Sequence, residues 1–233
     1  MNERRLIALR DLYRGRSCIL IGNGPSLRIE DLERLSDEIT FGCNRLHVVF
    51  GETAFRPTYY SVIDTTAASA EAAVLDSMPV TKLLPYEFRS YLRRHENCVY
   101  FDTGGGNLRG FSPNPLRQEL YGGYSVLFIQ MQIAFFMGFE TVYLIGCDHS
   151  WQLPAESHVQ GNEVMLVSDR ELNHFHPDYH RPGDVWAKPK PDLQNQAFEL
   201  AERFYRKAGR SILNATRGGK LETFPRVDFD RVF

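Results

Sequence analysis

The sequence has few of the features that mark disulfide-bonded, metal-binding or membrane-spanning proteins. Only four of its 233 residues are cysteines, and no two of them form a Cys-x-x-Cys pair. Each lies in or beside an apolar run, so we expect reduced thiols in the core and no zinc site. The longest apolar stretch, Val126 to Met137, is interrupted by two glutamines and is too short to span a bilayer.

A basic excess and an apolar leader are also missing. The formal net charge is −2 and the hydrophobic content is 43%, which is typical of a soluble globular protein and argues against nucleic acid as a partner. The charged first residues do not form a signal segment, so we expect a cytoplasmic protein. The amphipathic segment Arg4–Arg16 is compatible with packing on its own domain or with peripheral association at the inner face of a membrane. The sequence is also compatible with a homo-oligomer.

Two nucleotide-binding fingerprints are incomplete. The apolar run Cys18–Ile21 leads into Gly22-Asn23-Gly24-Pro25-Ser26-Leu27, but Leu27 stands where the dinucleotide fingerprint has its third glycine. The second apolar run ends in Asn44 and not in the acidic residue that grips an adenosine ribose. No Gly-Lys-Ser/Thr follows either, so NAD and a P-loop nucleotide are both disfavoured.

The Gly22–Leu27 loop nevertheless favours a phosphorylated ligand. Glycine and asparagine tolerate φ > 0, which lets backbone N–H groups approach an anion. An ordinary β-turn uses the same residue types. Because the loop after the first strand of an open α/β sheet is the usual binding crevice, we expect Gly22, Asn23, Gly24 and Ser26 to contact a ligand.

Strand and helix patterns alternate along the chain. Strands are expected at Ser17–Ile21, Ile39–Cys43, Thr58–Ile63, Thr81–Leu84, Cys98–Phe101, Thr141–Gly146 and Ser211–Leu213, and helices at Ile29–Leu35, Thr66–Leu75, Glu87–His95, Ser125–Met137 and Asp192–Lys207. This alternation predicts one α/β domain over residues 1–233, with a Rossmann-like, mostly parallel sheet and helices on both faces.

Two long stretches fit neither helix nor strand. Asp102–Gly123 contains three consecutive glycines from Gly104, and Ser150–Pro191 holds most of the histidines and many prolines. Loops of this length in a compact domain are typical of lids or disordered inserts. We expect residues 150–191 to form a lid.

Polar residues follow four of the expected strands: Asn23, Asn44, Asp64 and Asp148. In a parallel sheet they meet at the carboxyl edge, where ligands bind. Asp64 can instead cap the helix that follows it. Asp148 has no nearby helix to cap, so we expect it in the site.

The segment Asn173–His180 combines His174, His176 and His180 with Tyr179. Imidazole is a natural general base near neutral pH. Metal ligation and incidental surface histidines are the alternatives, but spacings of two and four residues on a proline-broken loop do not match a helical zinc motif. We therefore expect no metal site.

Two segments near the C-terminus offer weaker signals. Arg217 and Lys220, in a glycine-containing segment after the last strand, are placed to neutralise a phosphate, or the segment is simply a turn. The triplet Asp228-Phe229-Asp230 has the spacing of a transferase metal motif, but it does not follow an apolar strand, so we do not assign it a metal.

Four blocks in order, Gly22–Leu27, Cys43-Asn44-Arg45, Gly138–Asp148 and the histidine- and tyrosine-containing loop, resemble two related families. One is the family of bacterial sialyltransferases with a single Rossmann-like domain, which use CMP-activated sialic acid. The other is the family related to 6-hydroxymethylpterin diphosphokinase, many of whose members occur with surface-glycan and flagellin-glycosylation proteins.

The resemblance implies roles for matching positions. Asn23, Gly24, Ser26 and Asn44 correspond to nucleotide contacts, His174 or His180 to the general base, and Tyr179 to a side chain supporting the leaving phosphate. His176 is a weaker candidate for the base. We add Gly22, Asp64, Ser125 and Arg217 to the expected nucleotide site and Asp148 to the catalytic residues.

The sequence thus predicts a glycosyltransferase that moves a sugar from a nucleotide-sugar donor, with CMP-activated sugars among the donors, to a glycan or glycoconjugate acceptor in surface-polysaccharide synthesis. No tightly bound cofactor or metal is expected. Two alternatives stay open: a diphosphokinase-like phosphotransferase using ATP and Mg²⁺, and a non-catalytic nucleotide-binding subunit.

Overall fold

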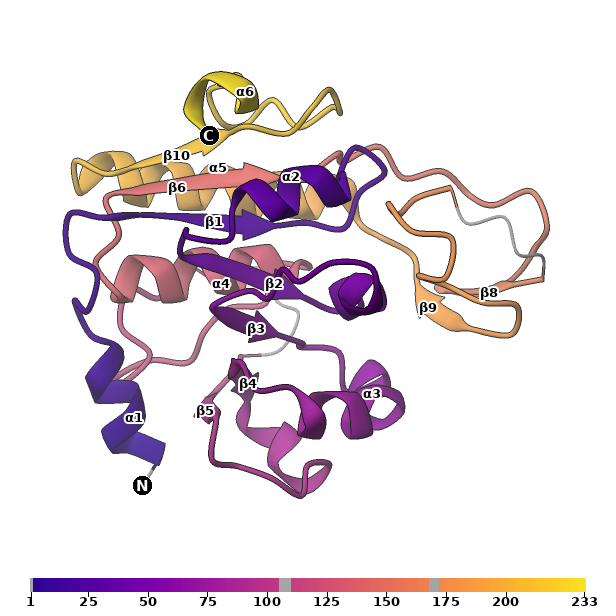
Figure 1. Cartoon of the computed structure of the whole chain (residues 1–233), viewed down its shortest axis with the longest axis horizontal. Helices are drawn as coiled ribbons and strands as arrows, with labels where there is room; N and C mark the ends of the chain where they lie inside the picture. The colour runs from indigo at the N-terminus through magenta and orange to yellow at the C-terminus, as the bar shows by residue number, and fades with distance from the viewer. Residues whose placement is uncertain (1, 105–109, 168–171) are drawn as a thin grey trace.

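The computed structural model describes residues 2–104, 110–167 and 172–233, without the side chains of residues 65–68, and centres on a seven-stranded parallel sheet (Figure 1). The strand order is β10-β6-β1-β2-β3-β4-β5. The bounds are β1 Ser17–Ile21, β2 Thr40–Cys43, β3 Tyr59–Ser61, β4 Thr81–Pro85, β5 Cys98–Phe101, β6 Thr141–Ile145 and β10 Ser211–Asn214. All seven predicted strands are present, and the fold is Rossmann-like.

Helices cover both faces of the sheet. They are α1 Asn2–Leu9, α2 Ile29–Arg34, α3 Thr65–Ser77, α4 Val126–Phe136, α5 Pro191–Lys207 and α6 Phe229–Val232, with 3₁₀ segments η1 Leu46–Gly51 and η2 Tyr86–Ser90. Side chains of β1 alternate between the two cores: Cys18 and Leu20 pack with α1, α4 and α5, whereas Ile19 and Ile21 pack with α2 and α3. Burial on both faces explains why the strand reads as a continuous apolar run.

The strand order reverses between β1 and β6. From β1 the sheet grows through β2, β3 and β4 to β5 on one side, while β6 and β10 extend it on the other. In an open α/β sheet the loops diverge at such a switch point and leave a crevice at the carboxyl ends of the strands. The Gly22–Leu27 loop follows β1 and Asp148 follows β6, so both border this crevice.

The α4 helix begins at the carboxyl edge and is apolar nearly all round. It packs between β1 and α5, and most of its residues are buried, as expected for a helix without a polar face. Two points fix it: the Ser125 hydroxyl caps its first turn by accepting from the Leu127 N–H at 3.3 Å, and the Tyr205 hydroxyl donates to the Met131 carbonyl at 2.7 Å. The N-terminus of a rigid helix thus faces the crevice.

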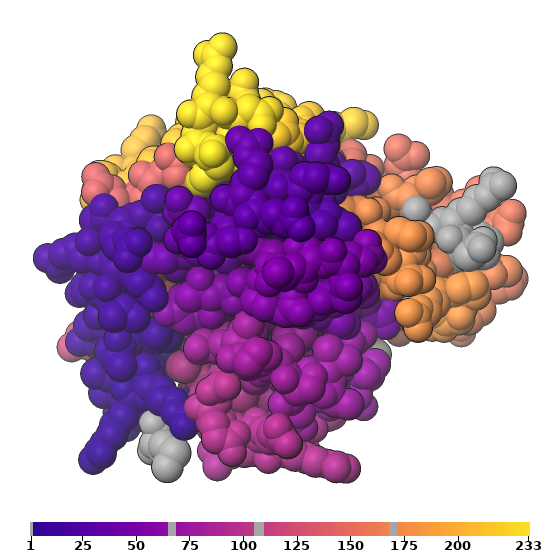
Figure 2. Space-filling model, viewed as in Figure 1, coloured from indigo at the N-terminus to yellow at the C-terminus, as the bar shows by residue number. Residues whose placement is uncertain are grey.

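The insert differs from the prediction. Residues 150–191 were expected to contain no strand, but they include a three-stranded antiparallel sheet of β7 Ser157–Gln160, β8 Glu163–Leu166 and β9 Val185–Ala187. Val164 and Leu166 point inward and Met165 outward, an alternation too short to stand out in the sequence. Figure 1 shows the insert beside the arrowheads of β1 and β6, and Figure 2 shows it as a projection from the main body.

A second prediction was wrong: Glu87–His95 is not an α-helix. Only the 3₁₀ segment η2 forms, and the chain then turns. The Asp76 carboxylate of α3 accepts hydrogen bonds from the N–H groups of Arg93 and Arg94, which replaces helical bonding there. In the other predicted loop, Asp102–Gly123, the described residues contain no helix or strand; the second and third of its consecutive glycines lie outside the described residues.

The N-terminal helix α1 packs on the sheet. Leu6 and Leu9 are buried in the core, and the Asn2 side chain donates to the Tyr100 carbonyl and accepts from the Tyr100 N–H. Ile7 and Leu12 are exposed. Within the described ranges, no helix is long and apolar enough to cross a membrane.

Candidate functional site

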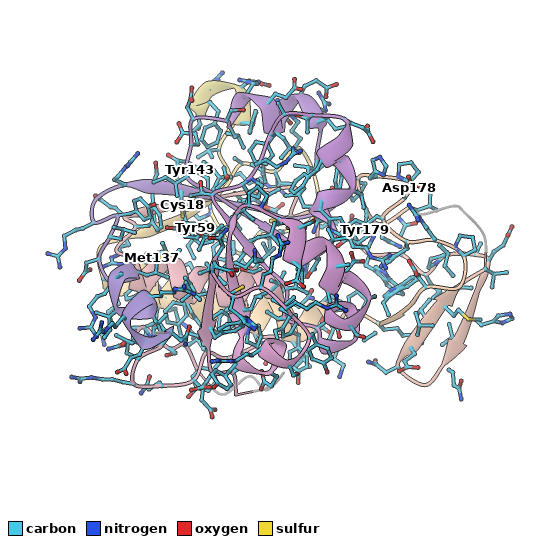
Figure 3. The ribbon with its side chains drawn as sticks, turned by 60° about the horizontal axis from the view of Figure 1, so that its bottom comes forward. Cys18, Tyr59, Met137, Tyr143, Asp178 and Tyr179 are labelled. Carbon is cyan, nitrogen blue, oxygen red and sulfur yellow. The ribbon has the colours of Figure 1, made fainter. Side chains whose placement is uncertain are left out.

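Two adjoining cavities lie between the carboxyl edge of the sheet and the insert. The smaller has a volume of about 360 Å³ and the larger about 840 Å³, both within the usual size range of ligand sites. Asn44, Ser125, His174 and Tyr179 line both, so the two cavities form one cleft. Figure 3 shows Tyr179 between the main sheet and the insert.

Most of the residues predicted for the site line this cleft. The smaller cavity contains Gly22, Asn23, Gly24, Asn44, Ser125, Asp148, His174 and Tyr179, and the larger adds Asp64 and His180. Ser26 and Arg217 line neither cavity. His176 also lies outside, where its Nε2 is 2.8 Å from the Glu52 carboxylate. The roles of these residues stay predictions.

The glycines after β1 are required for a reason other than the predicted one. We expected Gly22 and Gly24 to adopt positive φ, but neither does. A Cβ on Gly22 would lie 2.4 Å from the Gly146 carbonyl oxygen, and a Cβ on Gly24 would lie 2.0 Å from the Asp148 carboxylate. Gly22 therefore lies against the backbone of the loop after β6 and Gly24 against the Asp148 side chain, so neither position has room for a Cβ.

Most N–H groups of the Gly22–Leu27 loop donate hydrogen bonds to other groups of the protein. Gly22 and Gly24 donate to backbone carbonyls of the β6 end, Leu27 donates to Gly24, and Ser26 donates to the Asp148 carboxylate. Pro25 has no N–H. In this geometry the loop does not present the row of amides that a phosphate cradle needs.

Asp148 holds the two loops together. Its Oδ2 accepts from the Ser26 hydroxyl at 2.7 Å, and its backbone carbonyl accepts from the Lys220 N–H at 2.6 Å. Burial raises the pKa of the Asp148 carboxyl more than the hydrogen bonds from Ser26 lower it. Asp148 thus borders the cavity while part of its hydrogen-bonding capacity is already committed.

Backbone strain concentrates at the cleft. Four described non-glycine residues have positive φ, and three of them, Asn44, Tyr124 and His149, line the cavities, with φ of 50°, 58° and 52°. Asn44 is held there because its carbonyl accepts from the Tyr60 hydroxyl at 2.6 Å and its N–H donates to the Ser61 carbonyl. Such conformations persist where surrounding structure imposes them, commonly at functional sites.

Asn23 joins the sheet to the insert. Its Nδ2 donates to the Cys43 carbonyl at 3.1 Å and to the Tyr179 hydroxyl at 3.3 Å, and its backbone carbonyl accepts from the Phe175 N–H. Burial raises the pKa of the Tyr179 phenol, which therefore stays protonated at neutral pH. Because Tyr179 accepts from Asn23, its own proton remains available to donate.

The insert supplies two stacked ring pairs to the cleft. His174 stacks on Tyr179 with ring centroids 3.7 Å apart, and His180 stacks on Trp186 at 4.1 Å. The His174 and His180 rings meet edge to face at 4.8 Å. Both predicted general-base candidates are therefore held by packing and face the same cleft.

Arg45 is the main ionic link between the sheet and the insert. Its Nε lies 2.8 Å from the Glu71 carboxylate of α3, while its Nη1 donates to the Tyr179 carbonyl at 2.7 Å and contacts the Asp184 carboxylate. Glu71 is also 3.0 Å from His47, and hydrogen bonds from His47 and Arg45 lower the pKa of Glu71 against the effect of burial.

Replacing Arg45 by leucine is expected to release the insert. The change removes the guanidinium that donates to the Tyr179 carbonyl and to Asp184, which keeps the Arg181 N–H as a donor, and charged hydrogen bonds of this kind contribute enough to speed local opening about tenfold. Limited proteolysis should therefore cut residues 150–191 faster. Arg181→Leu is the control, because Arg181 is 70% exposed and lies 4.0 Å from Asp178. Equal cleavage rates in the two variants would contradict the role of Arg45 in holding the insert against the sheet.

Arg217 has a structural role in this arrangement. Its guanidinium pairs with Asp31 at 2.8 Å and with Asp230 at 2.6 Å, and it lies over the Phe229 ring. Asp228 caps α6, so neither aspartate of the Asp-x-Asp triplet lines the cleft. Lys220, from the same segment as Arg217, lines the smaller cavity.

Sequence reasoning gave no role to several residues that line the cleft, among them Arg45, His149, Trp151 and Trp186. His149 follows Asp148 directly, so its position after a strand end was an available signal. Burial lowers the pKa of His149 more than Asp192 raises it. Trp186 had no such signal, because the strand that carries it was not recognised.

The comparisons with known proteins agree with this architecture. The family model described as 6-hydroxymethylpterin diphosphokinase MptE-like matches residues 1–153. The chain belongs to this family. The MptE-like match covers the strands from β1 to β6 together with Asn23, Asn44 and Asp148, and it ends where the insert begins. It therefore includes neither of the two general-base candidates, His174 and His180.

A solved structure extends the likeness over the whole fold. The MAf glycosyltransferase from Magnetospirillum magneticum AMB-1 matches 99% of this MptE-like chain with a TM-score of 0.54 and 14% identity. The match spans 38% of the MAf chain. At this identity the likeness concerns the fold. A search among curated proteins found no match.

Proposed function

We propose that the protein is a glycosyltransferase that takes a sugar from a nucleotide-sugar donor. The observation that carries the proposal is the shared wall of the two cavities, where Asn44, the N-terminus of α4 at Ser125, and His174 meet. Such a transfer needs a group that binds the phosphate, here a helix N-terminus, next to an imidazole that takes the proton of a hydroxyl. The fold shared with the MAf glycosyltransferase supports the same class.

The phosphate of the donor is placed at the start of α4. This helix has no charged residue in its first turn, so its amide dipoles face the cleft without a competing carboxylate. Tyr179 donates its phenolic proton to the phosphate from the lid side. Lys220 adds a positive charge to the smaller cavity, whereas Arg217 is committed to Asp31 and Asp230. Asp64 lines the larger cavity, and we assign it contacts with hydroxyl groups of the substrates.

His174 is proposed as the general base because it lines both cavities. It takes the proton of the acceptor hydroxyl as that oxygen forms a bond to the anomeric carbon. The bond between this carbon and the phosphate oxygen breaks, and the phosphate keeps the electron pair. The α4 N-terminus and Tyr179 stabilise that developing charge. His180 and Trp186 form an aromatic wall of the larger cavity on which the acceptor sugar rests.

Donor turnover with and without a chelator tests this proposal. Purified protein should consume a CMP-, UDP- or GDP-activated sugar at a rate that EDTA does not change, since no metal is assigned a role. Because the matching family is described as diphosphokinase-like, the opposite outcome also has a specific interpretation. ATP-dependent phosphate transfer that EDTA abolishes, with no nucleotide-sugar consumption, would replace the proposal by a diphosphokinase-like activity. Nucleotide binding without turnover of any donor would instead indicate a binding subunit.

A further inference from the structure

The amino edge of the main sheet, opposite the cleft, carries a concentration of basic residues. Residues 2–16 contain five arginines and two acidic residues, and residues 202–210 contain four basic residues and one acidic residue, although the chain as a whole has a net charge of −2. Figure 1 shows α1, the segment from α1 to β1 and the end of α5 on the side away from the insert. Positive charge therefore gathers at this end of the molecule.

Backbone hydrogen bonds join the two basic segments into one surface. Before β1, the Tyr13 N–H donates to the Met137 carbonyl at 2.9 Å, and the Arg16 carbonyl accepts from the Glu140 N–H at 2.8 Å. Before β10, the Ser211 N–H donates to the Glu140 carbonyl at 2.9 Å. Because β1, β6 and β10 are neighbours in the sheet, the segments that enter these strands lie side by side.

Two of the nine basic residues in these segments fix the fold. Arg5 donates to backbone carbonyls at the start of β5, and Arg210 donates to the Phe135 carbonyl at 2.6 Å. The other seven are exposed: Arg4, Arg10, Arg14, Arg16, Arg203, Arg206 and Lys207. Arg14 and Arg206 pair with acidic residues three and four positions away, and exposed pairs of this kind are weak. The charge of all seven therefore faces solvent.

Exposed apolar side chains lie in the same region. Ile7, on the outward face of α1, is 49% exposed, and Leu12, between α1 and β1, is 51% exposed. The insert has an equally exposed leucine, Leu153, but the charged residue nearest to it along the chain is Glu156. The amino edge thus combines apolar side chains with positive charge, a combination typical of surfaces that lie on a membrane.

We propose that these seven basic residues, together with Ile7 and Leu12, bind the surface of a bilayer that contains anionic lipids. The basic side chains are complementary to the lipid phosphates, and each basic residue near such a surface strengthens binding. Ile7 and Leu12 enter the boundary between headgroups and acyl chains, an apolar environment that a nucleic acid does not offer. This role does not depend on the proposed transferase function.

Docking through the amino edge orients the cleft. The basic residues lie at the amino edge of the parallel sheet and the cleft lies at its carboxyl edge, so the two surfaces are at opposite ends of the strands. The insert, which projects from the main body in Figure 2, then points away from the bilayer. A substrate therefore reaches the cleft from the aqueous phase.

Flotation with lipid vesicles tests the proposal. The full chain should float with vesicles of equal parts phosphatidylcholine and phosphatidylglycerol but not with phosphatidylcholine alone, and added salt should weaken binding because exposed charges are screened. Arg14→Gln and Lys207→Gln should each lower the partition coefficient about fivefold, the usual contribution of one basic residue. Arg181→Gln is the matched control, because this arginine is 70% exposed on the insert, and it should bind as the wild type does.

The two equally exposed leucines test the apolar part of the contact. Leu12→Ser should lower vesicle binding about tenfold, because it removes a side chain that leaves water on docking, whereas Leu153→Ser should have no effect. Melting temperatures verify that each variant is folded. Loss of binding in Arg14→Gln with none in Leu12→Ser would indicate a purely electrostatic contact and overturn the membrane assignment. Equal losses in the two leucine variants, equal binding to both kinds of vesicle, or no vesicle binding would overturn it as well.

Discussion

Replacing His174 by alanine is expected to lower kcat by about 10²–10⁴-fold, the usual effect of losing a general base, with little change in nucleotide affinity. His174 lines both cavities, and the proposed mechanism assigns it the proton of the acceptor hydroxyl. Because its ring is stacked on Tyr179, alanine also removes a packing contact. Steady-state turnover together with a nucleotide titration separates the two effects.

His174→Phe sharpens this test, since phenylalanine preserves ring stacking and removes both ring nitrogens. It should lose as much turnover as alanine if proton transfer is the role, and much less if stacking is the role. The same pair of substitutions at His180, whose ring stacks on Trp186 in the larger cavity, should cost less. Wild-type turnover in both His174→Ala and His180→Ala would remove the lid-base proposal.

Gly22→Ala is expected to have the largest effect on stability of any conservative change at the site. Its Cβ would lie 2.4 Å from the Gly146 oxygen, a backbone atom that cannot rotate away. Such overpacking typically costs about 1–3 kcal/mol. For a chain of this size each kcal/mol lowers Tm by about 2–4 °C. Thermal unfolding followed by circular dichroism gives the shift.

Gly51→Ala is the control for this substitution. A Cβ on Gly51 meets no atom within 4 Å, so its Tm should stay close to that of the wild type. If Gly22→Ala melts with the control, the close contact of Gly22 with the loop after β6 is contradicted. If Gly22→Ala is less stable but still binds nucleotide normally, this contact holds the fold and does not shape the site.

Sequence patterns predicted the main sheet well for a physical reason. Strands buried on both faces, such as Cys18-Ile19-Leu20-Ile21, are apolar at every position, and few other short segments of a protein show this pattern. The insert strands escaped prediction because each is three or four residues long and only partly buried, so the apolar alternation of β8 covers just Val164 and Leu166. Short exposed strands depend on their partners, which a local pattern does not contain.

The site was predictable where the sheet alone determines position. Asn23, Asn44 and Asp148 follow parallel strands, so the topology brings them to one edge. The partners of these groups were not predictable. The sequence does not indicate that Ser26 binds Asp148, or that Arg217 pairs with Asp31, because those contacts join segments far apart in the chain. We therefore propose the N-terminus of α4 as the phosphate position, whereas the sequence alone had indicated the glycine loop.

A crystal structure of the protein with a bound nucleoside monophosphate tests the central claim most directly. The nucleotide should lie in the cleft between the carboxyl edge of the sheet and the insert, with its phosphate at Ser125 and the open end of the cleft directed toward His174. A nucleotide bound away from the carboxyl edge of β1 and β6, or a phosphate held by the backbone of the Gly22–Leu27 loop, would contradict the account.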